Sequence, residues 1–247
     1  MHYFSAAHLT RIPPMNRRTR IALFLTAPLF SILVGCSSGP KIMASTTIPE
    51  SGFLPNYRLL QLVPNTPDGT RIWRYRKAGV NPNSYTAVML DPIFLNQSQF
   101  TKEITPQVVA QTKRVLEASM REAVERKGNI TIVNQPGPGV ARISVGITGA
   151  EISADGLKPW SFTPIGLAAN AAAYASGVNA KTPALVVESK ITDSQSKEFI
   201  GGGVITLEGE SFRTGSGSIE AFQEMAKRVV RLALETSANT TPSTAMK

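Results

Sequence analysis

Histidine and cysteine are nearly absent from this chain. Its 247 residues contain two histidines, His2 and His8, and one cysteine, Cys36. A disulfide within one chain needs two cysteines and is therefore excluded. A long apolar run is also missing, because the stretch from Ile21 to Gly35 falls short of the about 20 residues of a membrane-spanning helix and contains Pro28. The sequence does not favour a transmembrane span here.

The apolar run ends instead in a pattern typical of bacterial lipoproteins. Three arginines between positions 17 and 20 precede it, and Leu33-Val34-Gly35-Cys36 closes it. A basic flank, a short apolar core and small residues at its end are typical of a signal peptide. The last four residues look like a lipobox, at which diacylglycerol is attached to the cysteine and the chain is cut before it. We predict a signal peptide over residues 1–35 and lipidation of Cys36. The alternatives are an ordinary signal peptide with a chance cysteine and a short N-terminal anchor helix.

The first fourteen residues do not share this pattern. Met1 to Pro14 carry two prolines and little positive charge, whereas Met15-Asn16-Arg17-Arg18 has the form of the basic flank. We therefore predict that translation starts at Met15.

Cleavage before Cys36 and lipidation would leave the mature chain without histidine and without a free thiol. Both histidines would be lost, and the lipid would occupy the cysteine sulfur. No Ser-His-Asp triad, Cys-His pair or zinc site of histidine and cysteine could then form within one chain. We expect no catalytic residue, no metal and no cofactor.

The net positive charge of the mature chain indicates which kinds of partner it could bind. The leader holds four arginines and no acid, so the net charge falls from +9 to +5 on cleavage. This balance favours solubility, or attraction to anionic lipid, lipopolysaccharide or peptidoglycan. We expect no nucleic acid as a partner in that compartment.

The mature chain is long enough for one domain with its own core. Residues 36–50, rich in serine, threonine and proline, predict a lipidated tether. Residues 51–236 predict a single α+β periplasmic domain, and the polar residues 237–247 a disordered tail. Ser37 follows the cysteine where aspartate would suggest retention in the inner membrane. We therefore expect a lipid anchor in the outer membrane, with the domain facing the periplasm.

Apolar periodicity predicts two helices. Thr105 and Pro106 begin the first and Gly128 ends it, and the second spans Ser218 to Thr236. The inward stripe of the first helix is predicted to hold Val109, Val115, Leu116, Met120, Ala123 and Val124. Strands are predicted from β-branched or alternating residues over 71–77, 85–93, 130–133, 141–152, 184–191 and 199–207. The expected fold is an α+β two-layer sandwich, with a mixed or antiparallel sheet of about five strands and two helices on one face.

Three glycines, Gly201-Gly202-Gly203, lie inside the last predicted strand. No Gly-Lys-Ser/Thr follows them, so they do not form a phosphate-binding loop. We expect a bulge or a close backbone approach at this point.

Two stretches are candidate partner surfaces. The first is a short basic and aromatic alternation that contains Arg71, Trp73, Arg74, Tyr75 and Arg76. It suits an edge strand that presents cations to an anionic polymer. The alternative is an ordinary amphipathic strand, with Ile72 and one aromatic inward and its arginines in solvent. The second is the alanine-rich segment 166–180, in which Ala169, Ala173 and Gly177 repeat at four-residue spacing. This spacing suits close helix contact, as in a homo-oligomer, or a compact loop.

Enzymatic alternatives rest on few residues. Ser194-Gln195-Ser196-Lys197 matches the Ser-x-x-Lys of penicillin-recognising enzymes, but it falls in a predicted hairpin turn with no Lys-Thr-Gly partner. A carboxylate pair of the glycosidase kind could draw on Asp91, Glu151, Asp155 and Glu188. Most of these acids are better explained as residues of turns and strand ends.

Four segments together resemble a known family. They are the lipobox, Gly52 to Tyr57, Tyr85 to Pro92, and Val187-Glu188 with Asp193 ahead of the hairpin turn. They are similar to the domain-of-unknown-function family 3313, lipoproteins of Gram-negative bacteria. The resemblance implies an envelope lipoprotein over nearly the whole mature chain and supplies no catalytic residue. It also implies a glycine in the Asp193 turn where this chain has Lys197.

The sequence thus favours a lipoprotein that acts as a binding or assembly module in the cell envelope, without chemistry. Its partner would be an envelope protein or an anionic envelope polymer. A structural role in envelope integrity, or polymer binding, is the alternative. A histidine-free hydrolase that uses carboxylates is a third hypothesis.

Overall fold

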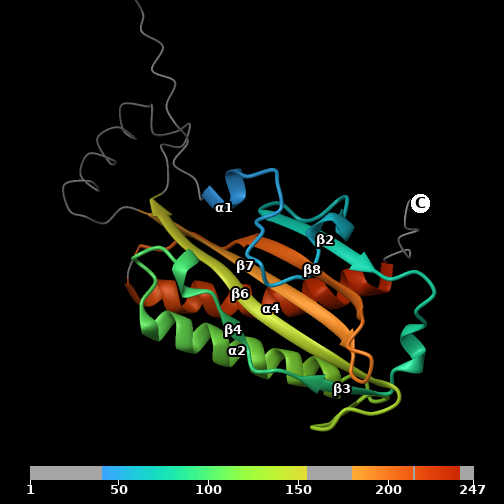
Figure 1. Ribbon diagram of the computed structural model, residues 1–247. Helices are drawn as coiled ribbons and strands as arrows, with labels where there is room; N and C mark the ends of the chain where they lie inside the picture. The colour runs from blue at the N-terminus through green and yellow to red at the C-terminus, as the bar shows by residue number, and fades with distance from the viewer. Residues whose placement is uncertain (1–40, 155–179, 214, 240–247) are drawn as a thin grey trace, which may run out of the picture. The chain divides into compact units, whose positions relative to one another are not determined.

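A computed structural model of the protein describes residues 41–154, 180–213 and 215–239. Within them, one sheet of eight strands carries two long helices on one face (Figure 1). The predicted α+β fold, with a mixed sheet and two helices on one face, is confirmed. The sheet has more strands than the predicted five or so, and the two strands that the sequence does not predict, over 61–62 and 94–95, are each only two residues long and too short for a period-two pattern. The strands are β1 (Gln61–Leu62), β2 (Thr70–Arg76), β3 (Ala87–Leu90), β4 (Phe94–Leu95), β5 (Thr131–Ile132), β6 (Val140–Ala154), β7 (Lys181–Asp193) and β8 (Phe199–Glu208).

The strands follow the order β1-β2-β8-β7-β6-β3-β5, and β4 also pairs with β6. From β1 to β6 all neighbours are antiparallel, whereas β3 and β4 run parallel to β6, and β5 runs parallel to β3. Parallel neighbours need a crossover connection, and the helix α2 lies in the chain between β3 and β6. The sheet is therefore a long antiparallel centre with a short parallel margin.

Helix α2 (Pro106–Glu125) begins as the sequence predicts. The side chain of Thr105 accepts a hydrogen bond from the amide of Val108, and Pro106 takes the first turn. Gly128 follows the helix with φ 67°, a conformation that suits glycine. The buried stripe differs from the prediction at its start, where Val108 and Thr112 point inward and Val109 is only half-buried. Thr112 can face inward because its hydroxyl donates to the carbonyl of Val108 at 2.7 Å.

Helix α4 (Gly215–Asn239) supplies much of the main core. Its buried residues Phe222, Met225, Ala226, Val229 and Val230 pack together with β6, β7 and β8 and with α2. The helix runs to Asn239, so the predicted disordered tail begins inside it; residues 240–247 lie outside the described residues. No helix of the described segments is long and apolar enough to cross a membrane.

The opposite face of the sheet is covered by residues 41–60, here called the N-terminal strap, which begins with α1 (Lys41–Ala44) (Figure 1). Leu54, Tyr57 and Leu60 are buried there against Trp73, Val186 and Val204. Ile42 and Ile48 join this second cluster. The prediction of a tether over residues 36–50 is therefore corrected for residues 41–50, which pack on the domain because their isolated apolar residues find a sheet face to cover.

The three glycines of β8 mark a close backbone approach, as predicted. A Cβ atom built on Gly202 would lie 2.3 Å from the carbonyl oxygen of Ser189, and one on Gly203 would lie 2.4 Å from that of Trp73. The strand lies between β2 and β7; the backbone of β7 lies close to Gly202 and that of β2 close to Gly203. A register shift between β7 and β8 follows at Ile191 and Thr192.

Candidate binding site

The basic and aromatic strand predicted as one surface is divided between two faces of the sheet. Arg71, Trp73 and Tyr75 point toward the N-terminal strap, whereas Arg74 and Arg76 lie on the helix face with Ile72, as the alternation of β2 requires. Ile72 therefore faces the core, as the alternative of an amphipathic strand predicts. Both strand faces, however, are covered over much of their length.

On the strap face, these side chains serve the fold. Trp73 is 5% exposed and belongs to the second core cluster, so it offers no free ring to a partner. Arg71 donates to the carbonyl of Met43 at 2.6 Å and also to that of Ser45. Tyr75 stacks on Phe199 with ring centroids 5.2 Å apart. A partner contact through the exposed parts of Tyr75 and Arg76 stays a prediction.

Arg74 is largely buried where α4 ends. Its Nη1 donates to the carbonyl of Ala233 at 3.0 Å and to the hydroxyl of Thr236 at 2.6 Å. Burial lowers the pKa of this guanidinium, and the positive charge of Arg76 lowers it further, to about 10. Among the described residues, the buried Nε of Arg76 has no hydrogen-bond partner. The two arginines thus share one face of the sheet, and the Nε–H of Arg76 has no acceptor among the described residues.

These arginines line an apolar hollow between the sheet and the two helices. Its inner lobe, of about 210 Å³, lies under the C-terminal halves of α2 and α4 and is walled by side chains such as Leu90, Met120 and Val230. Its outer lobe, of about 240 Å³, lies next to Arg76, Val80 and Tyr85. Both lobes are lined by Arg74, Ile143 and Ile191, so they adjoin one another. The sequence could not indicate this hollow because its lining comes from seven separate strands and helices.

The hollow is lined by few polar residues. Apart from the two arginines, the polar residues that line it are Tyr75, Tyr85, Lys127 and Ser189. No carboxylate lines either lobe within the described residues. Across the described segments, no three histidine, cysteine or acidic side chains gather where a metal could bind.

The candidate carboxylates have structural partners and lie apart. Asp91 accepts from Arg142 at 2.9 Å and from the hydroxyl of Ser144 at 2.6 Å. Glu151 accepts from the amide of Ile42 at 3.0 Å. Glu151 pairs across the sheet with Ala184, four residues along β7 from Glu188. That offset is roughly 13 Å along a strand, beyond the roughly 5–9.5 Å between paired glycosidase carboxylates. Asp155 lies outside the described residues.

Glu188 is fully buried beneath the N-terminal strap. The hydroxyl of Tyr57 donates to its Oε2 at 2.6 Å and itself accepts from the amides of Ser51 at 3.1 Å and Leu54 at 3.3 Å. Burial raises the pKa of Tyr57, and the hydrogen bond to Glu188 raises it further. The hydroxyl therefore joins the strap to the centre of the sheet.

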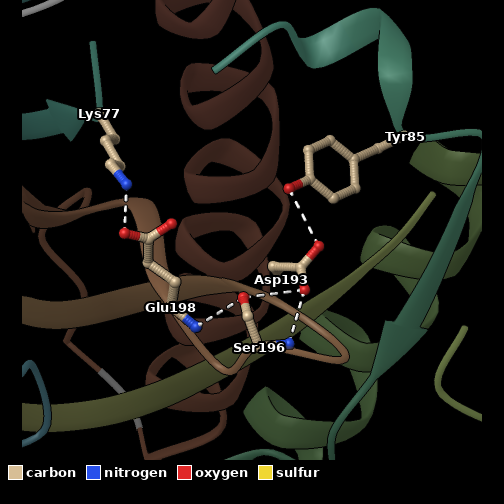
Figure 2. A network of polar contacts seen from close by, with 5 residues as sticks. All are labelled: Lys77, Tyr85, Asp193, Ser196 and Glu198. Carbon is tan, nitrogen blue, oxygen red and sulfur yellow. Dashed lines mark hydrogen bonds and ion pairs between the residues drawn. The ribbon is translucent and has the colours of Figure 1, made fainter. Parts of the chain in front are cut away.

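Asp193 organises the turn between β7 and β8 (Figure 2). Its Oδ1 accepts from the amide of Ser196 at 2.8 Å, and its Oδ2 accepts from the hydroxyl of Tyr85 at 3.2 Å. The bond from the Ser196 amide is the main cause that lowers the pKa of Asp193. Lys77 pairs with Glu198 on the far side of the turn. Two of these hydrogen bonds thus join segments that carry the family resemblance. The bond from Tyr57 joins the first segment to Glu188, and the bond from Tyr85 joins its segment to Asp193.

The Ser-x-x-Lys match is part of this turn and does not form a catalytic pair in the structure. The hydroxyl of Ser194 donates to the carbonyl of Gly137 and accepts from its amide, both at 3.1 Å. Lys197 is exposed and has φ 60°, in the left-handed region that favours glycine. The expectation of glycine at this position therefore has a conformational reason.

Replacing Lys197 with glycine is expected to raise the free energy of unfolding by about 0.5–1 kcal/mol, because glycine adopts positive φ without a Cβ clash. Chemical denaturation of the two proteins measures the difference. Lys197→Ala is the matched control, since it removes the same charge and keeps the Cβ atom. Equal stability of the glycine and alanine variants would contradict the conformational explanation.

Several predicted site residues cannot be placed. The lipobox Leu33-Val34-Gly35-Cys36 and the small-residue repeat of Ala169, Ala173 and Gly177 lie outside the described residues. Lipidation and contact between copies through that repeat therefore stay predictions.

Taken together, the described residues form an α+β sandwich domain with a strap on one sheet face and an apolar, arginine-lined hollow on the other. Residues 49–233 match a family described as protein of unknown function, DUF3313, and the chain belongs to this family. The resemblance seen in the sequence is confirmed. No curated protein sequence matches the chain.

Solved structures show weak likeness to this fold. A PelC dodecamer from Paraburkholderia phytofirmans is 10% identical, with a TM-score of 0.35, over 64% of this chain and 95% of that one. A hemagglutinin homologue from Helicobacter pylori, described as putative and neuraminyllactose-binding, is 11% identical, with a TM-score of 0.39, over 66% and 86%. A minor lipoprotein from Acinetobacter baumannii is 10% identical, with a TM-score of 0.31, over 65% and 98%. Likeness at this level transfers no function to the chain.

Proposed function

We propose that the protein is a lipoprotein, anchored in the outer membrane through Cys36, whose domain binds an envelope partner without catalysing a reaction. The observation that carries the proposal is the hollow on the helix face, where apolar side chains surround Arg74 and Arg76 and no carboxylate lines the described walls. Such a lining recognises a ligand by shape and charge.

Polymer binding in support of envelope integrity is the second candidate. It draws on the groove between α2 and α4, which is lined by Arg126, Lys127, Lys227 and Arg231. Part of this charge is compensated locally, because Arg126 pairs with Glu122 at 3.8 Å and Lys227 pairs with Glu224 at 2.6 Å. The hollow is therefore the better supported site.

Crosslinking of the lipidated protein in membranes, followed by purification, tests the proposed function. Intact-mass measurement should show a mature chain that begins at a lipid-modified Cys36. A defined envelope component should be captured with this protein, and much less of it with a Cys36→Ala variant that lacks the anchor. An unmodified cysteine, or the same capture from both proteins, would contradict the anchored role.

A further inference from the structure

The helix face of β2 presents two positive charges to an apolar space. Arg74 and Arg76 are two residues apart on one strand, so both side chains leave the same face of the sheet. Burial lowers the pKa of Arg74, and the positive charge of Arg76 lowers it further. A buried charge is costly unless it is compensated, and placing a second like charge beside it adds to the cost. An anion beside Arg76 would compensate its charge and accept a hydrogen bond from its Nε, which has no partner among the described residues.

The hollow around these arginines has two distinct ends. The inner lobe is aliphatic, with half-buried side chains such as Leu90, Met120 and Ile130 in its wall. The outer lobe contains Arg76, with its unpartnered Nε among the described residues, and the ring of Tyr85. Arg74 lies where the two lobes adjoin. An apolar channel that leads to a pair of cations matches a molecule with an apolar tail and one anionic end.

We propose that the hollow binds one medium-chain fatty acid, with the acyl chain in the inner lobe and the carboxylate at Arg76 and Arg74. The proposal rests on the proposed function and names the ligand class of that same site. A carboxylate fits the forked guanidinium in a two-point hydrogen bond. The lobes of about 210 and 240 Å³ suit a slender chain.

The lining favours a fatty acid over larger lipids. A phospholipid would bring a second chain and a glycerol ester, and few polar side chains of the described wall could serve them. Beyond the arginines, the polar residues of the wall are Tyr75, Tyr85, Ser189 and Lys127. The hydroxyl of Tyr85 already donates to Asp193. A single carboxylate is therefore the head group that this lining satisfies best.

Calorimetric titration with laurate, kept below its micelle concentration, tests the proposal on the full mature chain. A Cys36→Ala background removes the lipid of the protein itself, which would otherwise compete. We expect saturable binding of one laurate per chain. Dodecanol, which has the same tail and no charge, should bind about tenfold or more weakly, and acetate should not bind measurably. Absence of saturable laurate binding, or equal binding of dodecanol, would overturn the proposal.

Arg76→Gln tests the head-group contact. Arg76 is preferred over Arg74 because Arg74 also contacts the end of α4. The affinity for laurate should fall about tenfold to a hundredfold, because a charge-assisted hydrogen bond is lost. Lys77→Gln is the matched control, since it removes one positive charge from the next residue, whose side chain pairs with Glu198. If both variants lost the same affinity for laurate, the loss would come from net charge alone, and the proposed contact would be overturned.

The outcomes separate this inference from the proposed function. A membrane partner captured through crosslinking, together with no laurate binding, would reject the fatty acid and leave the binding role in place. Tighter binding of the soluble two-chain dihexanoylphosphatidylglycerol than of laurate would overturn the single-chain assignment in favour of a phospholipid. Laurate binding without any captured partner would keep the ligand and reject the assembly role.

Discussion

Replacing Tyr57 with phenylalanine is expected to lower the free energy of unfolding by about 2–4 kcal/mol. The substitution keeps the ring in its buried site and removes only the hydroxyl, which donates to Glu188 and accepts from the amides of Ser51 and Leu54. Glu188 is 0% exposed, so water cannot replace the lost donor without opening the strap. Urea denaturation of the two proteins measures the loss.

Tyr85→Phe is the matched control for this prediction. It removes the same kind of hydrogen bond, from a tyrosine hydroxyl to a carboxylate, at an open turn where water reaches Asp193. We expect a loss of about 1 kcal/mol or less. The double variant with Glu188→Gln should recover part of the loss of Tyr57→Phe, because the neutral amide leaves no unpaired charge in the buried site. Equal losses at Tyr57 and Tyr85 would show that the buried pair does not fix the strap.

Replacing Gly202 with alanine is expected to destabilise the domain by about 3 kcal/mol or more, at the upper end of overpacking effects. The added methyl group would lie 2.3 Å from the carbonyl oxygen of Ser189, a backbone atom held in the central sheet. Relief therefore requires β7 and β8 to separate. Thermal unfolding of the variant measures the effect.

Gly201→Ala supplies the comparison within the same glycine run. There the nearest atom to an added methyl group is the carbonyl oxygen of Tyr75, at 3.3 Å, which a small shift accommodates. We expect a loss of about 1 kcal/mol. If the two alanine variants were equally stable, the close approach at Gly202 would not be the reason for glycine there.

The sequence predicts best those features that depend on neighbouring residues. Thr105, Pro106 and Gly128 mark the ends of α2 because capping and left-handed φ are local requirements. The strands β6, β7 and β8 are long enough for their alternation to be recognised. The two-residue strands β1 and β4 are too short to show such an alternation, whereas β5 lies within the predicted strand 130–133.

The parts of the site that sequence reasoning missed depend on contacts between distant segments. In the sequence, Tyr57 belongs to a family-like segment, and Glu188 belongs to another and is also a candidate carboxylate. The two residues are 131 positions apart, and nothing local shows that they share a hydrogen bond. Arg74 was predicted in a surface strand because a two-residue alternation does not reveal that helices cover the other face. The packing of Ile42 and Ile48 was hidden for a similar reason, since isolated apolar residues in a polar stretch look like a linker.

The packed strap changes how an anchored domain would search for partners. Only five peptide units separate Cys36 from Lys41, where α1 begins. They span roughly 18 Å at full extension. If Cys36 carries the lipid, the domain is confined to a thin layer next to its own membrane and diffuses in two dimensions. Tethering over so short a range can give effective concentrations on the order of mM. Even a weak affinity would then keep the domain occupied by neighbours in that membrane, whereas a partner in the opposite membrane would itself have to bridge the gap.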